Sequence, residues 1–240
     1  MSFTPQTKIG DVVLHMPEAM RVFERLNLDY CCGGHRTMSE VCSKAGLDAT
    51  QVLVELDTLS RGSQGPSDPG PWAAAPLKDL IAHIEAKHHT FTRDELHRVA
   101  PLMEKVLRVH GDHHPELAEI ARLFGDLMAD LMPHLEKEEQ ILFPYIRNLE
   151  AGGSRPDACF GSVQGPISAM QEEHEQAGEI LRSLKALTSD YTPPEDACGS
   201  YRSLYMGLQA LEEDLHLHIY LESHLLFPRA IALEATISQR

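Results

Sequence analysis

Apolar residues recur at intervals of three and four over four long stretches that begin at Leu77, a pattern that predicts amphipathic helices and no strands. Three segments rich in Gly, Pro, Asp and Ser interrupt these stretches, at 110–115, 151–166 and 188–200. Four long helices joined by connections of these lengths are typical of an antiparallel four-helix bundle. The pattern therefore predicts an all-α fold with such a bundle over residues 77–240.

The N-terminal quarter of the chain has helical patterning of its own. It is clearest in the segments "PEAMRVFERLNLDY" and "TQVLVELDTLS". The segment that follows, "RGSQGPSDPGPWAAAP", has the Gly, Pro and Ser content of a linker. We therefore expect a small N-terminal helical domain at 1–60, a linker at 61–76 and the bundle at 77–240.

Polar residues interrupt the apolar stripes of the bundle while keeping their spacing. Three stripes show this, and their members are Ile120, Leu123, Leu127, Leu131, His134, Glu138, Ile141 and Tyr145; Ile167, Met170, His174, Ala177, Leu181 and Leu184; and Leu204, Leu208, Leu211, Leu215, His218, Glu222 and Leu225. Polar groups in a core are costly unless they are paired or bind a metal. Several of them at matching depth predict a metal site.

An internal repeat strengthens this prediction. The segments "HLEKEEQILFP" (134–144) and "HIYLESHLLFP" (218–228) share the pattern His-x-x-x-Glu followed by Leu-Phe-Pro. Residues four apart lie on one helical face, so both side chains can reach one ion. Each repeat is preceded by a helix with an inward histidine, which is His174 in one case and His88 or His89 in the other. Imidazole and carboxylate ligands together suit iron or manganese, and carboxylates can bridge two ions.

Periodicity does not decide between His88 and His89. The apolar residues before them put His88 in phase; these are Leu77, Ile81 and Ile84. The apolar residues after them put His89 in phase; these are Leu96, Val99, Met103 and Val106. The two alternatives stay open at this point.

Composition narrows the classes of partner. The 240 residues carry 21 Lys and Arg against 36 Asp and Glu, a net charge of −15, which argues against nucleic acid or an anionic membrane as a partner. No apolar run has membrane-spanning length, and no basic segment followed by an apolar one opens the chain. Five cysteines, an odd number, fit a reducing compartment. We therefore expect a cytoplasmic protein.

The segment "DYCCGG" holds two adjacent cysteines, Cys31 and Cys32, followed by two glycines. Glycine permits unusual backbone angles, so the pattern predicts thiols on an exposed turn, with a pair of small, partly buried residues as the alternative. Adjacent cysteines form only a strained and labile disulfide. The other three cysteines have no partner in the sequence and are expected to be inert; they are Cys42, Cys159 and Cys198.

Together these segments resemble the hemerythrin-like proteins, and among them the iron–sulfur cluster repair di-iron proteins. The resemblance covers nearly the whole chain and rests on "DYCCGG", "HLEKEEQILFP", "GPISAMQEEHEQAG", "TPPEDAC" and "HIYLESHLLFP". It implies two non-haem iron ions held by His89, His134, Glu138, His174, His218 and Glu222. In this scheme Glu138 and Glu222 bridge the irons. The family has an aromatic residue where this chain has His88, so competition of His88 for the metal stays open.

The resemblance also implies a function, the repair of iron–sulfur clusters damaged by nitric oxide or oxidants. Its partners would be damaged iron–sulfur proteins and nitric oxide or dioxygen, and a homodimer is an expectation of the resemblance alone. Cys31 and Cys32 would contact the damaged cluster or accept the transferred group. Two interpretations of Glu173 stay open: it is a hydrogen-bond acceptor or proton relay beside the metal, or it is a solvated helix charge.

Two other functions use the same ligands. One is a hemerythrin-like module that binds or senses dioxygen or nitric oxide without turnover. The other is a di-iron nitric oxide reductase. The sequence does not decide between iron donation and nitric oxide chemistry, nor whether the chain is an enzyme.

Overall fold

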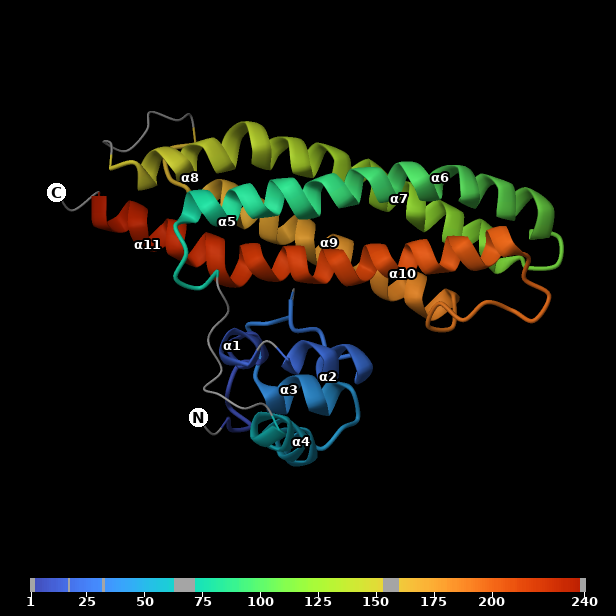
Figure 1. Ribbon diagram of the computed structural model, residues 1–240, viewed down its shortest axis with the longest axis horizontal. Helices are drawn as coiled ribbons and strands as arrows, with labels where there is room; N and C mark the ends of the chain where they lie inside the picture. The colour runs from blue at the N-terminus through green and yellow to red at the C-terminus, as the bar shows by residue number, and fades with distance from the viewer. Residues whose placement is uncertain (1–2, 17, 32, 63–71, 153–159, 238–240) are drawn as a thin grey trace.

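The computed structural model describes residues 3–16, 18–31, 33–62, 72–152 and 160–237. A small group of short helices lies beside one long bundle, as Figure 1 shows. The short helices are α1 (Ile9–His15), α2 (Ala19–Arg25), α3 (Met38–Lys44) and α4 (Ala49–Gly62). We call them the N-terminal unit.

Local sequence explains where one of these helices begins. The Thr37 side chain accepts a hydrogen bond from the backbone N–H of Glu40, and the Glu40 carboxylate accepts one from the backbone N–H of Thr37. This reciprocal pair satisfies two backbone donors that the start of a helix leaves without partners, and it fixes the first turn of α3.

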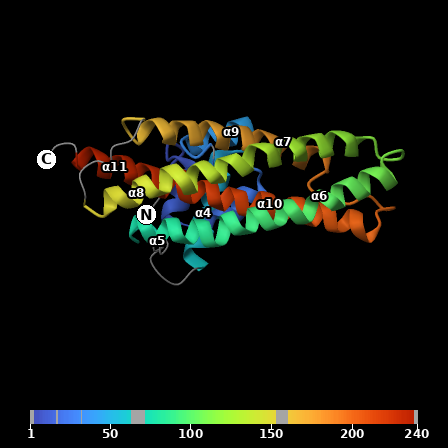
Figure 2. The same cartoon turned by 90° about the horizontal axis from the view of Figure 1, so that it is seen from above.

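The bundle consists of long helical segments that run back and forth, side by side in both views (Figures 1 and 2). In chain order they are α5 (Leu77–His83), η1 (Ile84–His89) and α6 (Thr90–His110); α7 (Glu116–Lys137), η2 (Glu138–Leu142) and α8 (Phe143–Glu150); α9 (Gln164–Leu187); and α10 (Gly199–Tyr220), η3 (Leu221–Leu226) and α11 (Phe227–Ile237). The segments labelled η are single π-helical turns inside otherwise α-helical rods. Helix α6 packs on α10, and α7 packs on α9. The predicted all-α fold with an antiparallel four-helix bundle is confirmed.

Carboxylates from neighbouring helices close one end of the bundle. Glu150, at the end of α8, accepts hydrogen bonds from the backbone N–H groups of Leu77 (2.6 Å) and Lys78 (2.8 Å). Glu234 on α11 accepts one from the backbone N–H of Val163 (3.0 Å) in the same way. Helices α5 and α9 are therefore capped by side chains that are distant in sequence, which fixes their starts relative to the bundle.

The buried apolar residues form two clusters with a polar layer between them. One cluster joins the N-terminal unit to the nearer half of the bundle and includes Phe23, Tyr30, Ile84, Leu142 and Ile219. The other fills the far half and includes Leu96, Leu127, Leu131, Ala177 and Leu215. The buried histidines and glutamates of the repeated motifs lie between these clusters in each of the four rods.

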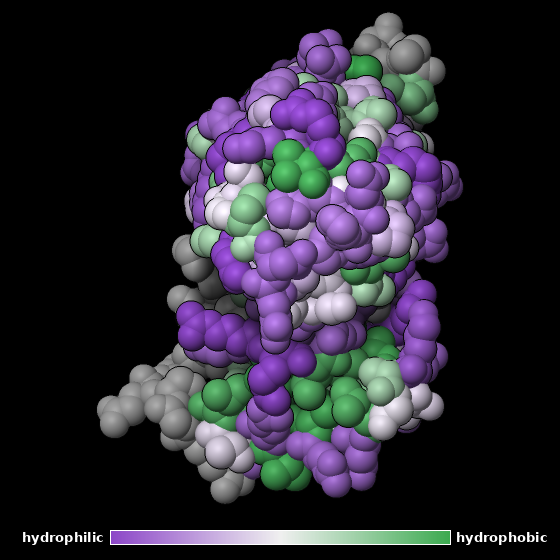
Figure 3. Space-filling model, turned by 90° about the vertical axis from the view of Figure 1, so that its right-hand side faces the viewer, coloured by the Kyte–Doolittle hydropathy of each residue, from purple (hydrophilic) through white to green (hydrophobic). Residues whose placement is uncertain are grey.

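The surface differs between the two parts of the molecule. Viewed from the end where the α6–α7 and α9–α10 connections lie, apolar side chains gather on the N-terminal unit, while that end of the bundle is largely hydrophilic (Figure 3). Val54 and Leu59, both on α4, are exposed apolar residues. Within the described residues, no helix combines the length and apolarity needed to cross a membrane.

Candidate metal centre

Three π-turns set the register of the side chains at the centre. The turn η1 ends at His89, η2 begins at Glu138, and η3 contains Glu222. A π-turn inserts one extra residue into a helix and so rotates the residues that follow relative to those before, and such turns are frequent at functional sites. The change of phase near His88 and His89 in the sequence is this insertion.

One predicted core position is wrong for the same reason. Ile141 was expected to face inward after Glu138, but it lies within η2 and its surface is 51% exposed. Leu142 and Tyr145 are buried on either side of it. Pro144 and Pro228 are the second residues of α8 and α11, just after η2 and η3 end, and both helices continue beyond them. Proline lacks the backbone N–H of a regular helical ladder, so it is tolerated where a π-turn already interrupts that ladder.

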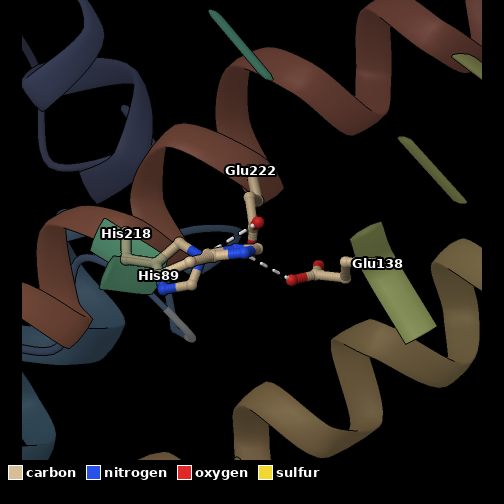
Figure 4. A group of neighbouring side chains, drawn as sticks. All are labelled: His89, Glu138, His218 and Glu222. Carbon is tan, nitrogen blue, oxygen red and sulfur yellow. Dashed lines mark hydrogen bonds and ion pairs between the residues drawn. The ribbon is translucent and has the colours of Figure 1, made fainter. Parts of the chain in front are cut away.

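The first half of the centre consists of His89, His218 and two carboxylates (Figure 4). The Nε2 atoms of His89 and His218 lie 3.2 Å apart. Oε2 of Glu138 lies 3.4 Å from Nε2 of His89, and Oε1 of Glu222 lies 3.0 Å from Nε2 of His218. All four side chains are buried, so these polar atoms face one another in a site closed to solvent.

The second half repeats this arrangement with His134 and His174. Their Nε2 atoms also lie 3.2 Å apart. Oε2 of Glu138 is 3.4 Å from Nε2 of His134, and Oε2 of Glu222 is 3.1 Å from Nε2 of His174. Glu138 thus presents one oxygen to both histidine pairs, while Glu222 presents one oxygen to each pair. Both carboxylates lie where a group that bridges two metal ions would lie.

His89 is held in place from outside the centre. Its Nδ1 donates a hydrogen bond to Oε1 of Glu139 (2.7 Å), and both oxygens of Glu139 accept hydrogen bonds from Arg93 (2.8 and 2.9 Å). A hydrogen bond at Nδ1 keeps that nitrogen protonated and leaves the lone pair of Nε2 free for a metal. The sequence interpretation missed Glu139. Its position directly after Glu138 was the only available signal, and its partners come from another helix.

His134 has an equivalent support. Its Nδ1 donates a hydrogen bond to Oε2 of Glu173 (2.8 Å), and the other oxygen of Glu173 is bonded by Lys137. Glu173 thus accepts a hydrogen bond beside the centre while its side chain stays 31% exposed, and its role as a proton relay stays a prediction. Each half of the centre therefore contains one unit of histidine, carboxylate and cation, and this unit holds Nε2 toward the centre.

Burial sets the protonation of the histidines. Burial, followed by the neighbouring imidazole of His218, lowers the pKa of His89 to about 4. Burial and the imidazole of His174 lower the pKa of His134 to about 4 in the same way. Both rings are therefore neutral at pH 7, which is the form that binds a metal.

Their surroundings shift the pKa values of the two glutamates, Glu138 and Glu222, in opposite directions. Burial and the charge of Glu222 raise the pKa of Glu138 well above its usual range. Burial alone would raise the pKa of Glu222, but His218 and His174 outweigh it and hold that pKa well below its usual range. Neither oxygen of Glu138 accepts a well-formed hydrogen bond from any described residue. The neutral imidazoles of His89 and His134, the ionised carboxylate of Glu222 and the carboxyl group of Glu138 belong to a donor set that fits a metal such as iron.

The structure brings the six residues of the predicted ligand set together and leaves His88 outside. Its Nδ1 bonds Oδ1 of Asp214 at 2.9 Å, and its ring stacks on that of His218 with centroids 5.7 Å apart. His88 belongs to neither of the two groups of possible ligands, whereas His89 does. A void of about 10 Å³ borders the centre next to His134 and His174, enough space for one water-sized molecule.

The sequence predicted that the thiol of Cys31 lies on an exposed turn, but in the structure Cys31 is buried. Cys31 is only 3% exposed, and its Sγ donates a hydrogen bond to Oδ1 of Asp29 (3.4 Å). Cys32 and Cys159 lie outside the described residues.

A Cβ atom at Gly34 would overlap the ring of His224, so this glycine is needed for close packing of the N-terminal unit against the bundle. A cavity of about 350 Å³ is lined by Cys31 from the N-terminal unit and by His174 from the centre.

Comparison with known proteins agrees with this architecture. Residues 80–230 match the family model described as "Hemerythrin HHE cation binding domain", and residues 5–60 match a "Domain of Unknown function (DUF542)". The chain is 39% identical to the iron–sulfur cluster repair protein YtfE of Musicola paradisiaca over 96% of this chain and 98% of that protein. It is 37% identical to YtfE of Citrobacter koseri (98% and 100% covered) and to YtfE of Escherichia coli (94% and 97% covered). The chain therefore belongs to the hemerythrin HHE cation binding domain family and, within it, to the group of iron–sulfur cluster repair proteins that these relatives represent.

Proposed function

We propose that the chain binds two iron ions at this centre, one at each histidine pair, with both carboxylates shared. His89 and His218 would hold one ion, and His134 and His174 the other. What supports this is that the two groups of four possible ligands have Glu138 and Glu222 in common. Four imidazoles and two carboxylates leave coordination positions free for a small exogenous ligand.

Iron at this site would supply one-electron redox chemistry and binding of diatomic gases. The chain itself supplies the environment for that chemistry. The two apolar clusters exclude bulk water from either side of the polar layer. Glu139 and Glu173 orient two of the histidines and are each neutralised by a cation, Arg93 and Lys137.

We propose further that the protein repairs iron–sulfur clusters damaged by nitrosative or oxidative stress, as the names of its relatives indicate for those proteins. Repair requires iron or nitric oxide to pass between a damaged cluster and this centre. Cys31 and Cys32 are our candidates for the groups that contact the cluster. The cavity that Cys31 and His174 both line supports this assignment, because thiolates are ligands of iron–sulfur clusters and of iron.

Metal analysis is the first test. Protein purified without oxygen should contain two irons per chain and show the spectrum of a coupled pair. Glu138→Gln and His134→Gln should lose this signal, while Glu136→Gln, on the same helix but exposed, should keep it. One zinc ion per chain, or an unchanged spectrum in Glu138→Gln, would contradict the proposed site.

Repair is tested separately with an iron–sulfur enzyme whose cluster has been damaged by nitric oxide. The loaded protein should restore its activity, and Cys31→Ser and Cys32→Ser should restore less at the same iron content. A reversible oxygen adduct without repair would instead indicate a gas-binding module. Steady consumption of nitric oxide with an added reductant, again without repair, would indicate a reductase.

A further inference from the structure

A second reactive group lies at the end of the bundle where the α6–α7 and α9–α10 connections meet, away from the N-terminal unit (Figure 1). Cys198 is the residue that immediately precedes α10, a helix of 22 residues. Its backbone is extended there (φ −74°, ψ 172°), and the residue is exposed. The sequence indicated no partner for this cysteine and predicted that it would be inert.

The structure gives Cys198 an imidazole partner. Nε2 of His110, the last residue of α6, lies 3.2 Å from Sγ of Cys198, within hydrogen-bond distance for sulfur. The ring of His110 packs against Tyr201 in the first turn of α10, with ring centroids 5.3 Å apart. His110 is therefore fixed on one side by the tyrosine and faces the sulfur. A thiol within reach of a positioned imidazole is the arrangement of an activated cysteine.

The remaining groups at this end also favour a thiolate. The backbone N–H of Tyr201, followed by His110 and the backbone N–H of Ser200, lowers the pKa of the Cys198 thiol to about 7. Lys105 on α6 bonds the hydroxyl of Ser200 (2.9 Å) and adds positive charge beside the helix start.

Two acidic groups at this end of the bundle, Asp196 and Glu116, are already paired. Both oxygens of Asp196 bond Nε2 of His114 at 3.1 Å, and Glu116 bonds Nδ1 of the same ring at 3.2 Å. Each of these two carboxylates thus has a partner other than the sulfur. They oppose the negative charge of a thiolate less than free carboxylates would.

A metal site does not explain this cluster. Within the described residues, groups of three or more close metal-ligating side chains occur only at the centre in the middle of the bundle. His114 is occupied by Asp196 on one nitrogen and Glu116 on the other. The sulfur is left with the imidazole of His110, the backbone N–H groups at the start of α10 and open solvent, which suits a nucleophile.

We propose that Cys198 is a reactive thiolate, activated by His110 and by the start of α10, that forms mixed disulfides with low-molecular-weight disulfides. The thiolate sulfur attacks one sulfur of the disulfide, a new S–S bond forms at Cys198, and the old S–S bond breaks. The displaced half leaves as a thiolate and takes a proton from water. Cys198 is oxidised and the displaced sulfur is reduced, so the reaction needs no other oxidant.

The test measures the rate of alkylation of each cysteine by iodoacetamide in the full-length protein, from pH 5.5 to 9.5, by mass spectrometry of the peptides. Cys198 should react with a midpoint near pH 7 and, at pH 7, about tenfold faster than a free thiol, whose pKa is about 8.5. Cys42, which is fully buried, serves as the unreactive internal reference. Oxidised glutathione at pH 7 should modify Cys198 as a mixed disulfide.

Two variants test whether His110 activates the Cys198 thiol or whether the thiol reacts only because it is exposed. His110→Gln should raise the midpoint and slow alkylation at pH 7 by about threefold or more. His113→Gln, a change to the neighbouring exposed histidine that does not touch the sulfur, should leave both unchanged. Far-ultraviolet circular dichroism checks that each variant is folded. A midpoint at or above pH 8.5 in the wild type, or an unchanged midpoint in folded His110→Gln, would overturn the proposal.

Discussion

Replacing Glu138 with methionine is expected to make the metal-free protein more stable while abolishing its metal binding. Glu138 is completely buried, and burial and the charge of Glu222 raise its pKa well above the usual range. Within the described part of the chain, neither of its oxygens accepts a well-formed hydrogen bond. Without a metal, this carboxyl group is an uncompensated polar group in the core.

The expected size of the effect follows from that burial. A buried polar group without a partner costs about 1–3 kcal/mol. Methionine is similar in length and fills the same space with apolar atoms, so little cavity is left behind. We expect the free energy of unfolding of the metal-free protein to rise by about 2 kcal/mol. For a chain of this size the corresponding rise in Tm is about 4–8 °C.

Urea and thermal unfolding of chelator-treated protein, followed by circular dichroism, measure this effect. Glu136→Met is the matched control, because Glu136 is an exposed residue on the same helix and its replacement should change stability little. Adding ferrous iron without oxygen should raise the Tm of the wild type and of Glu136→Met but not of Glu138→Met. A metal-free Glu138→Met protein that is less stable than the wild type would refute the reasoning.

Three further predictions concern residues around the centre and in the core. Glu139→Gln should weaken iron binding by about 10–100-fold in competition with a chelator, because Nδ1 of His89 loses its charged acceptor; unchanged affinity would contradict this. Leu208→Ala should lower the free energy of unfolding by about 2–5 kcal/mol in urea, since Leu208 is buried in the far cluster, and a loss below 1 kcal/mol would be inconsistent with it. Burial lowers the pKa of His216 to about 4 from 6.5, so the unfolded chain binds the extra proton between these pH values and stability falls as pH falls. His216→Gln should therefore lose about 2 kcal/mol less than the wild type between pH 7 and pH 4.5 in urea titrations; equal losses would exclude His216 as the cause.

The periodicity of the sequence was sufficient to predict the all-α fold and most of the buried core positions. The three interruptions by Gly, Pro and polar residues and the 3-4 spacing are local signals, and the helices of the bundle begin and end close to these interruptions. The same spacing put His134, His174 and His218 on the inward stripes because a histidine in core phase stands out against leucines. These features depend on residues that are close together in one helix, so their spacing can be seen in a single sequence.

The parts that sequence could not supply depend on contacts between helices. The two competing phases at His88 and His89 contained the evidence for η1, but a one-residue insertion leaves no glycine or proline to mark it. Ile141 was misplaced for the same reason. The pairing of Glu139 with Arg93, and that of Cys198 with His110, join residues from different helices, so neither has a spacing to detect.

The polar layer between the two apolar clusters has a consequence for how the bundle unfolds. Without metal, the layer interrupts the continuous apolar packing that makes unfolding cooperative, because the buried apolar residues on its two sides form separate clusters. Metal ions shared by all four rods would join the halves into one cooperative unit. Hydrogen exchange should then show two protection levels in the metal-free protein, lower in one half than in the other, and a single level once iron is bound. The metal centre would thus make the unfolding of the bundle cooperative, in addition to its chemical role.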